Sequence, residues 1–566
     1  MTPLQPLVLS LVLLLPGATA FGAEAKPAAP WRSELYPTAP VNPAAANLTT
    51  DKVIQDFSYA GYRRGEVAIP DVGGPVRDVT AAPYSADATG KLDATAAIQA
   101  AINDAGQIGG GVVYLPAGTF LLSVAPEASE ALLISQPGVV LRGAGRERTF
   151  LVNTTFDPMR GKAVIRVKGP NGVRFNASSS IQTPLSSDLL HATTHIPVRD
   201  AALFSPGDTV IIRNDITPEW VEEQREPGWS GYEKKIGGIV YRRAVLAVDR
   251  KANVIMVDAP VRYALRLRDR ARVLRLAARP LAEVGLEDFS VGNVQHPGLT
   301  WEIRDTDTPG TSGYVVSGSG FIALEQVRDC WVRRVSSFAP EGNTSTAHLL
   351  SGGLQMRNAT HVTIKEVSLR RPQYGSGGQG YMFSIFPAQE TLLVRCEARF
   401  SRHGFSFGTP GSSGNVLHDC VDAETGNATG ATGGYRTNGF GSDHHMWFSH
   451  ANLTDVCTAE DSWFEAIYRP YATKPQHLIT ATHSVFWNTR GTGSIRDAVV
   501  KSEQFGWGYV IGTRGERHGV ELTTRATGIT DPADHVEGKG RGDSLEPFSL
   551  YLDQLHRRLG PSAPAP

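Results

Sequence analysis

Short runs of alternating apolar and polar residues repeat through the second half of the chain, and each run ends in a turn with Gly or Asn. The unit is clearest in Val327-Arg-Asp-Cys330-Trp-Val332, where a small residue separates two β-type segments. Further units align on Glu366, Cys396, Cys420, Cys457, Thr482 and Ser502, at steps of 20 to 37 residues. This variable period predicts coils of a solenoid, each stacked about 4.8 Å above the last. The four cysteines are then expected in one internal ladder, packed as small hydrophobic residues.

An amphipathic helix is predicted ahead of the repeats. Asp93 precedes the helix as a capping residue, and Gly109-Gly-Gly111 ends it before a strand at Val112 to Leu115. Its apolar stripe consists of Ala97, Ile98, Ala101 and Ile102. Helical segments do not alternate with the later strands, which excludes a doubly wound α/β fold. No group of four regular strands repeats, which excludes a propeller. The remaining fold is an all-β parallel β-helix with an N-terminal capping helix, and residues 547–559 are expected to close its other end.

The segment around this helix also carries a resemblance. It contains Asp87-Ala-Thr-Gly90, the helix, and Gly109-Gly-Gly-Val-Val-Tyr-Leu-Pro-Ala-Gly118. These motifs resemble the opening of the pectate-lyase-like family, in which an amphipathic helix covers the open end of a right-handed parallel β-helix. The resemblance implies this fold and a carbohydrate-active protein. It does not choose a reaction, because the family holds lyases, hydrolases, epimerases and phage depolymerases on one scaffold.

Several short β-runs between about residues 189 and 267 break the solenoid pattern. They include Val198 to Leu203, Gly207 to Arg213, Ala244 to Asp249 and Val254 to Val261, all separated by turns. We expect a compact antiparallel β-module inserted into the β-helix, whose domain spans residues 49–559.

The chain ends and the charge suggest where such a protein works. An apolar run from Leu7 to Leu15 precedes Ala18-Thr-Ala20, which predicts a signal peptide over residues 1–20 and secretion to the periplasm or the exterior. Residues 21–48 and 560–566 are rich in Ala and Pro and are expected to be flexible. The formal net charge of -1 favours neither nucleic acid nor a membrane surface as a partner. The sequence leaves the oligomeric state open.

Histidines concentrate in one part of the repeats, together with other side chains that suit sugar chemistry. His403 lies 17 residues before Cys420, Glu465 lies 17 before Thr482, and Asp443 lies 14 before Cys457. We therefore expect these three side chains on one face of adjacent coils, roughly 5–10 Å apart. Polar and aromatic residues nearby are candidate substrate contacts, since rings cover sugar faces and guanidinium groups pair with carboxylates. They are Arg402, Trp447, His483, Trp487 and Arg490.

Two reactions fit these residue types. A lyase that cleaves a uronic-acid polymer by β-elimination needs a cation for the carboxylate, a base and an acid. Arg402 or Arg469 would be the cation, Tyr468 the acid, and the base would come from His403, His444 and His445. A glycoside hydrolase would instead use a pair of carboxyl groups, Asp443 and Glu465. The resemblance favours the lyase, and a non-catalytic carbohydrate-binding surface protein is the third reading.

Each candidate also has a structural explanation. His444 and His445 point to opposite sides of a strand, so that one reaches the groove and the other packs. Glu465 and Arg469 can form a structural ion pair, and Asp443 can be a turn residue. No zinc spacing is present, and the compact acidic cluster that holds calcium in pectate lyases is missing. The sequence therefore identifies no cofactor, and calcium stays open only because the resemblance implies it.

Overall fold

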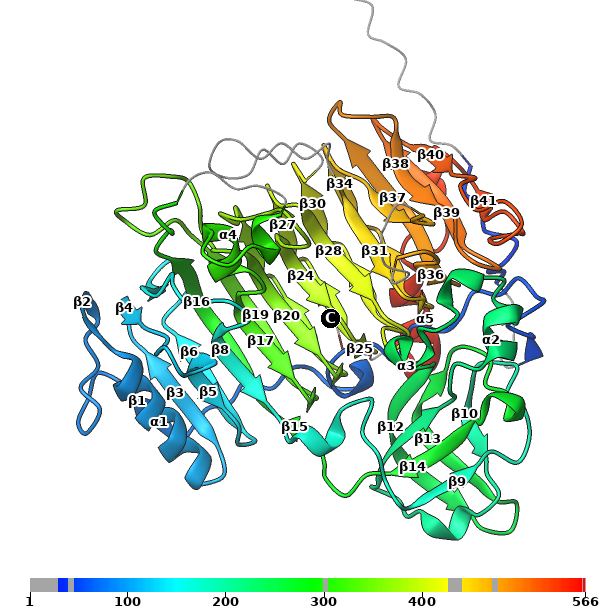
Figure 1. Cartoon of the computed structure of the whole chain (residues 1–566), viewed down its shortest axis with the longest axis horizontal. Helices are drawn as coiled ribbons and strands as arrows, with labels where there is room; N and C mark the ends of the chain where they lie inside the picture. Colours follow the sequence, from blue (N-terminus) through cyan, green and yellow to red (C-terminus); the bar gives the residue numbers. More distant parts are fainter. Residues whose placement is uncertain are drawn as a thin grey trace, which may run out of the picture.

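The alternating runs form the strands of a right-handed parallel β-helix (Figure 1). The computed structural model describes residues 29–38, 45–298, 304–425, 440–470, 477–561 and 563–564. The predicted signal peptide lies outside the described residues. No helix among the described residues is long and apolar enough to cross a membrane.

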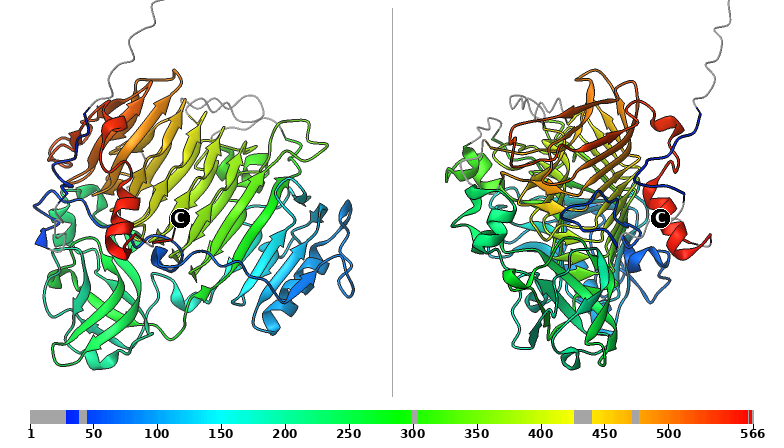
Figure 2. Two further views of the ribbon diagram at one scale, coloured as in Figure 1. Left: turned by 180° about the vertical axis from the view of Figure 1, so that it is seen from behind. Right: turned by 90° about the vertical axis from the view of Figure 1, so that its right-hand side faces the viewer.

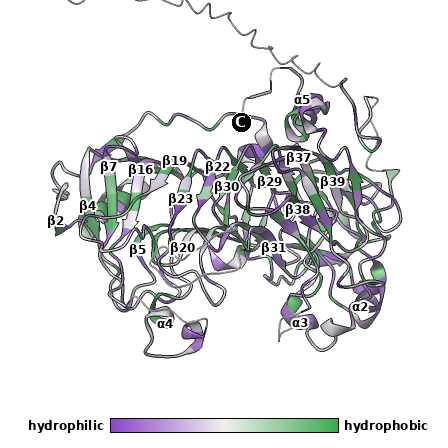
Figure 3. Cartoon of the chain, turned by 90° about the horizontal axis from the view of Figure 1, so that it is seen from above, coloured by the Kyte–Doolittle hydropathy of each residue, from purple (hydrophilic) through white to green (hydrophobic). Residues whose placement is uncertain are grey.

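One wall of the β-helix is a ten-stranded parallel sheet that carries the candidate residues. In chain order its strands are β5 (Glu130–Ile134), β8 (Ala163–Lys168), β17 (Gly320–Glu325), β20 (Gly352–Arg357), β24 (Tyr381–Ile385), β28 (His403–Gly408), β31 (Ser442–Met446), β35 (Phe464–Ala466), β38 (Ala498–Ser502) and β40 (Gly519–Leu522). Phe383 and Phe405 occupy paired positions on neighbouring strands, and their rings stack in the core at 4.8 Å. Figure 3 shows hydrophobic and hydrophilic residues interleaved along the strands, as expected when one face is buried.

The remaining walls belong to a bent nineteen-stranded sheet and two small sheets. The large sheet contains β1 (Val76–Asp78), β2 (Thr89–Asp93), β3 (Gly111–Leu115), β4 (Gly118–Leu122), β6 (Val139–Gly143), β7 (Thr149–Asn153), β16 (Gly285–Asn293), β19 (Trp331–Ser337), β22 (Thr363–Lys365), β23 (Ser368–Arg370), β26 (Leu392–Val394), β27 (Glu397–Arg399), β29 (Val416–His418), β30 (Val421–Ala423), β33 (Leu453–Asp455), β34 (Thr458–Glu460), β37 (Val485–Thr492), β39 (Tyr509–Gly515) and β41 (His535–Glu537). The small sheets contain β15 (Leu281–Ala282), β18 (Val327–Arg328), β21 (Ala359–Thr360) and β25 (Ala388–Gln389), and β32 (Ser449–His450) with β36 (Ala481–Thr482). A typical coil runs β24, β25, β26, β27 and then enters β28.

Three of the predicted ladder cysteines stack, and the rest of the ladder is different. Cys396, Cys420 and Cys457 each follow a residue with positive φ at the bend between two strands, and all three are buried free thiols. Cys330 instead precedes β19 at another corner, where its register neighbour is Val362. Glu366 is the positive-φ residue itself, so Val367 takes the ladder position. Thr482 and Ser502 end strands of other sheets. The sequence unit around each anchor is similar at different corners, which explains the misalignment.

A helix covers the N-terminal end of the β-helix as predicted, whereas the helix predicted to close the other end lies elsewhere. Helix α1 (Thr95–Gln107) buries Ile98, Ala101 and Ile102 in the core, and the Asp93 carboxylate accepts a hydrogen bond from the Thr95 amide at 2.8 Å. Helix α5 (Leu550–Leu559) does not close the other end. It packs on the outside of the nineteen-stranded sheet (Figure 2), because its apolar residues meet outward-facing residues such as Tyr509.

Part of the segment predicted to be flexible is also held against these coils. The Trp31 amide donates to the Ser544 carbonyl, and the Tyr36 hydroxyl donates to Asp553 of α5 at 2.7 Å. Farther along, the Phe57 amide donates to Gln554 at 2.8 Å and Tyr62 stacks edge-on against Trp331. Residues 29–38 and the segment 53–66 therefore line the outer side of the solenoid.

The inserted module is a six-stranded antiparallel sheet between β8 and β15. Its strands are β9 (Gln182–Pro184), β10 (Thr193–Pro197), β11 (Thr209–Arg213), β12 (Val240–Asp249), β13 (Val254–Val261) and β14 (Arg272–Arg275), so it extends beyond the predicted range of 189–267 on both sides. Two short helices belong to it, α2 (Pro218–Glu223) and α3 (Glu233–Ile236), while α4 (Ser312–Val316) lies in a solenoid loop. Buried Arg243 and Arg262 of the module both pair with Glu390 of the solenoid, which fixes the two parts together.

Candidate functional site

The strand register brings the central candidates together on the ten-stranded sheet. Ser406 of β28 lies beside Asp443 of β31, and Asp443 lies beside Glu465 of β35. Phe464 packs in the core, so Glu465 points outward, since successive side chains of a strand alternate. His403 begins β28 and has Tyr381 of β24 as its register partner. Neighbouring coils thus place side chains of different chemistry one above another.

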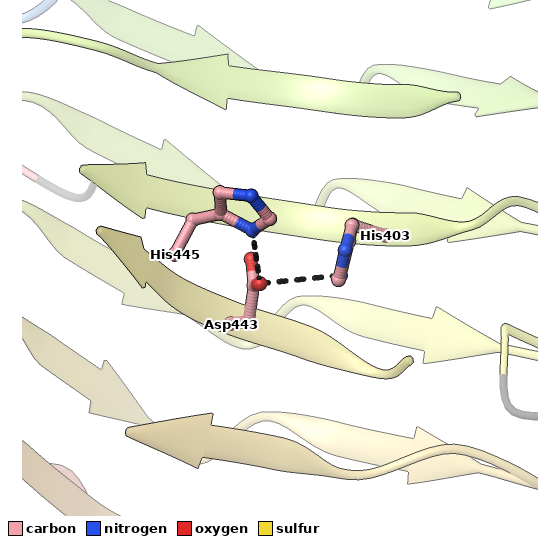
Figure 4. Close-up of side chains that lie close together, drawn as sticks. All are labelled: His403, Asp443 and His445. Carbon is pink, nitrogen blue, oxygen red and sulfur yellow. Dashed lines mark hydrogen bonds and ion pairs between the residues drawn. The ribbon is translucent and has the colours of Figure 1, made fainter. Parts of the chain in front are cut away.

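Asp443 is the centre of this cluster (Figure 4). Its Oδ2 atom lies 2.7 Å from His445 Nδ1, 2.7 Å from Arg469 Nη2 and 3.4 Å from His403 Nδ1. Its Oδ1 atom accepts a hydrogen bond from the Ser406 hydroxyl. Burial alone would raise the pKa of this carboxyl, but the neighbouring His403, Arg469 and His445 hold its pKa well below the usual range. Asp443 is therefore an ionised carboxylate whose acceptor positions are filled.

The contact with Asp443 fixes the proton of His445. An ionised carboxylate can only accept, so His445 Nδ1 carries a proton and donates it to Asp443. Arg469 Nη1 also approaches the same nitrogen, at 2.9 Å. Burial lowers the pKa of His445 below its ordinary value despite the nearby carboxylate, so the imidazole is neutral at neutral pH and its Nε2 atom bears a lone pair.

The Nε2 side of His445 faces the more open edge of the cluster. It lies 3.1 Å from the Tyr381 hydroxyl and 3.3 Å from His477 Nε2. Arg402 Nη1 donates to the same hydroxyl at 3.0 Å. Burial raises the pKa of Tyr381, which keeps its phenol protonated. Tyr381, Arg402 and His477 are partly exposed, whereas Asp443 and His403 are buried. A continuous chain of contacts therefore runs from buried Asp443 through His445 to Tyr381 and Arg402.

His403 supports this chain from behind. Its Nδ1 atom donates to the Gly441 carbonyl at 2.9 Å, and its ring stacks on Tyr381 with centroids 5.0 Å apart and planes inclined by 16°. The side chain is completely buried, which holds the pKa of His403 well below its ordinary value. Packing beneath the tyrosine ring fits this environment better than contact with a polymer.

Arg469 joins the two carboxylates that were candidates for a hydrolytic pair. Its Nη2 atom contacts both Asp443 and Glu465, and the Trp463 indole donates to the other oxygen of Glu465 at 2.7 Å. All these groups are buried, with Glu465 5 % and Arg469 3 % exposed. A guanidinium nitrogen thus occupies the space between the two carboxylates, and its charge is already compensated.

The other predicted residues lie elsewhere. His444 faces the core, where its Nδ1 atom is 2.8 Å from the Ser449 hydroxyl, and burial lowers the pKa of His444 to about 3. Tyr468 packs in the apolar cluster of the module. Trp487 is buried beneath α5 and donates to the Pro547 carbonyl at 3.1 Å. Arg490 is exposed on the nineteen-stranded sheet. His483 lines a separate cavity with Trp507, and Trp447 lines the pocket described below.

Tyr381 is the main residue that was missed. It lies 15 residues before Cys396, close to the 17 and 14 residues that single out His403 and Asp443. Extending the same count by one coil would have found it. His477 belongs to the histidine-rich interval, but coil spacing does not predict its approach to His445.

Two histidines and a carboxylate are also a possible ligand set for a metal ion. The ligand atoms of His403, Asp443 and His445 lie within 4.8 Å of one another. Calcium, which the family resemblance suggests, prefers an oxygen cage. The outward face of this cluster offers Asp443 and Glu465, and Arg469 already binds both. These residues do not fit calcium, because the guanidinium fills the place of the cation.

Comparisons with known proteins bear mainly on the first coils. Residues 77–182 match the model of the family "Rhamnogalacturonase A/epimerase, pectate lyase-like". This segment includes α1 and ends where the module begins. Together with the parallel coils, this match supports the resemblance of the first coils to the pectate-lyase-like superfamily.

Individual relatives share shorter stretches. The chain is 46 % identical over 68 residues to alginate lyase 7 of Azotobacter vinelandii, covering 12 % of this chain and 8 % of that protein. It is 42 % identical over 74 residues to mannuronan C5-epimerase AlgE4 of the same organism, covering 13 % of each. The chain thus spans about a tenth of the length of these relatives.

Solved structures with similar coils include the A-module of the same epimerase, AlgE4. Its A-module aligns over 81 % of this chain and 100 % of that one, with a TM-score of 0.28 and 12 % identity. The Gp54 tailspike of Acinetobacter baumannii bacteriophage AP22, solved with a capsular saccharide, covers 79 % of this chain and 67 % of its own, with a TM-score of 0.43 and 11 % identity.

Proposed function

We propose that this protein is a secreted polysaccharide lyase that cleaves a uronic-acid polymer by β-elimination. The observation that carries the proposal is the contact between His445 Nε2 and the Tyr381 hydroxyl, 3.1 Å apart, with Asp443 behind the imidazole. One neutral base and one protonated phenol stand side by side at the open edge of the cluster. Partial relatives named as an alginate lyase and a mannuronan epimerase, both enzymes of uronate polymers by name, agree with this substrate class.

The proposed reaction uses these two groups in turn. His445 Nε2 removes the proton at C5 of the uronate, and Asp443 stabilises the imidazolium that forms. The electron pair of the C5–H bond forms a C4–C5 double bond as the bond from C4 to the glycosidic oxygen breaks. Tyr381 donates its proton to the departing oxygen, and His445 returns a proton to the tyrosinate across their short contact. The cycle closes without a further reactant.

The geometry also suggests the stereochemistry and the cation. Base and acid lie next to each other, so they address the C5 proton and the leaving oxygen from the same side, which favours syn elimination. Arg402 is partly exposed beside Tyr381, and it is the guanidinium available to pair with the uronate carboxylate. Arg469, the other candidate cation, is compensated by two carboxylates and serves to hold Asp443.

A hydrolytic reaction has less support from this cluster. An acid and base pair of carboxyl groups must have the sugar between them, with one group protonated. Here one nitrogen of Arg469 lies between Asp443 and Glu465, and the pKa of Asp443 is held low. The guanidinium therefore fills the space that the sugar would need between the two carboxyl groups.

A single comparison of products tests the proposal. The purified protein is incubated with alginate, pectate and a neutral polysaccharide while reducing ends and ultraviolet absorbance of unsaturated uronate are followed together. Both signals should rise on a uronate polymer alone. New reducing ends without absorbance would indicate hydrolysis. Exchange of the C5 proton in deuterated water without cleavage would indicate epimerisation, and binding without any reaction would indicate a carbohydrate-binding protein.

A further inference from the structure

A second concave site lies where the inserted module meets the ten-stranded sheet. The cavity of about 280 Å³ is bounded on the solenoid side by residues that follow β20, β24, β28 and β31, among them Asn358, Pro387 and Trp447. On the module side it is bounded by Arg174, Arg213 and Lys235. Figure 1 shows α3, which contains Lys235, beside the carboxyl-terminal ends of these strands. The module therefore forms a wall at the end of the candidate site.

The charge of this cavity has one sign. Three cationic side chains line it, and no acidic residue is among the described residues of its lining. Asp215 lies 3.9 Å from Arg213 Nη2 but outside the lining. Within the described chain, neither Arg174 nor Lys235 forms an ion pair with a carboxylate, and both are exposed. The formal net charge of the protein is -1, so this local excess of positive charge is a specific feature of the cavity and favours binding of an anion.

Aromatic side chains complete the cavity. Phe175 and Trp447 line it, and Trp447 is half-buried. Trp447 and the next residue both have positive φ, 52° and 60°, an uncommon backbone conformation for large side chains. Phe448 packs edge-on against both Trp220 and Trp229 of the module, with ring centroids 5.4 and 5.7 Å away, and these two indoles stack on each other. The anchoring of Phe448 in the module thus sets where Trp447 lies.

The cavity lies close to the candidate site, beyond the ends of the same strands. Trp447 follows His445 by two residues, and Pro387 follows Phe386, whose ring centroid is 6.3 Å from that of His445. From Tyr381 to Ile385, strand β24 covers about 13 Å at a rise of about 3.3 Å per residue, and Pro387 lies two residues beyond its end. A polymer that reaches both sites must therefore be longer than the one unit held at His445.

We propose that the cavity lined by Arg174, Arg213, Lys235 and Trp447 is a binding subsite for a uronate unit of an acidic polysaccharide. The cations pair with the carboxylate of the sugar, and the aromatic rings cover its apolar face. The module then selects longer acidic chains, while the Tyr381 and His445 pair acts on a unit several residues away. This inference rests on the proposed function for the substrate class.

The test compares two matched charge reversals. Arg174→Glu with Lys235→Glu changes the cavity, and Arg250→Glu with Lys251→Glu makes the same change in net charge on the exposed turn between β12 and β13. Binding of uronate dimers and hexamers is measured by calorimetry in a His445→Ala background, so that no cleavage occurs. We expect the cavity variant to bind hexamers at least about tenfold more weakly and dimers unchanged, with no effect in the control.

The outcomes separate this inference from the proposed function. Equal hexamer binding by the cavity and control variants, or no hexamer binding by the parent protein, would overturn the subsite. Charge-dependent binding by a protein that cleaves no uronate polymer would support the subsite and refute the lyase. Arg174→Met with Lys235→Met gives a milder version should reversal disturb folding, which circular dichroism and thermal melting monitor. A hexamer of neutral sugars should bind equally to the parent protein and to all of these variants.

Discussion

Two stacks of side chains run across the coils, and they differ in almost every property. Cys396, Cys420 and Cys457 form an apolar stack in which one residue type recurs at one bend of each coil. On the ten-stranded sheet, Tyr381, His403 and Asp443 come from successive coils, and each has a different chemistry. Both stacks are products of the same parallel register. Repetition of one small residue packs the interior, whereas a change of residue type from coil to coil builds a chain of contacts that can move a proton.

Replacing His445 should have the largest effect. It tests whether the polar cluster on the ten-stranded sheet carries the reaction. His445→Ala removes the proposed base, so kcat/KM on a uronate polymer should fall about a thousandfold. The thermal midpoint should also fall, because His445 is buried and its Nδ1 atom bonds to buried Asp443, so circular dichroism must show that the variant is folded. Arg490→Gln, an exposed change on the nineteen-stranded sheet, is the control and should keep full activity. A His445→Ala enzyme with half the parent rate would exclude this residue as the base.

The ion pairs behind His445 should matter most for stability. Arg469→Met leaves Asp443 and Glu465 buried without their shared cation, which should lower the free energy of unfolding by about 3–5 kcal/mol. Denaturant titration measures this loss. Adding Asp443→Asn and Glu465→Gln to Arg469→Met removes the uncompensated charges, and much of the stability should return while activity stays low. A single variant as stable as the parent would mean that the cluster is open to water.

The sequence predicted the position of a side chain only where the spacing of neighbouring coils or the alternation along one strand determines it. Coil counting brought Asp443 and Glu465 together because parallel strands repeat the register, even though Thr482 was a wrong anchor for Glu465. It also placed His403 on the neighbouring strand, where its ring reaches Asp443 from the start of β28. Alternation along β31 predicted that only one of His444 and His445 faces outward. Trp487 was misjudged because α5, more than 60 residues later, covers it. Burial of a strand residue by a helix from a distant part of the chain cannot be predicted from the local sequence pattern.

A cysteine substitution tests the apolar stack. Cys420 is buried, and its thiol donates to the Leu393 carbonyl at 3.4 Å. Cys420→Ala should lower the free energy of unfolding by about 1 kcal/mol, since a single sulfur atom is lost from the packing. Catalytic constants should stay unchanged, and chemical denaturation together with steady-state rates would show both results. A loss of activity without a loss of stability would contradict the purely structural role of this stack.

The smallest predicted effect concerns the pH profile and tests whether Asp443 acts through His445. Burial lowers the pKa of His445 from 6.5, and the Asp443 charge opposes that shift. Activity should therefore be lost only as the pH falls below this lowered pKa, because protonated His445 cannot accept the C5 proton. On the alkaline side, the raised pKa of Tyr381 keeps the acid protonated beyond its ordinary value of 10. Asp443→Asn removes the charge that favours the imidazolium, so the acid limb of kcat/KM should move to lower pH while the plateau rate falls. A plateau that falls without movement of the limb would assign Asp443 to holding Arg469 alone.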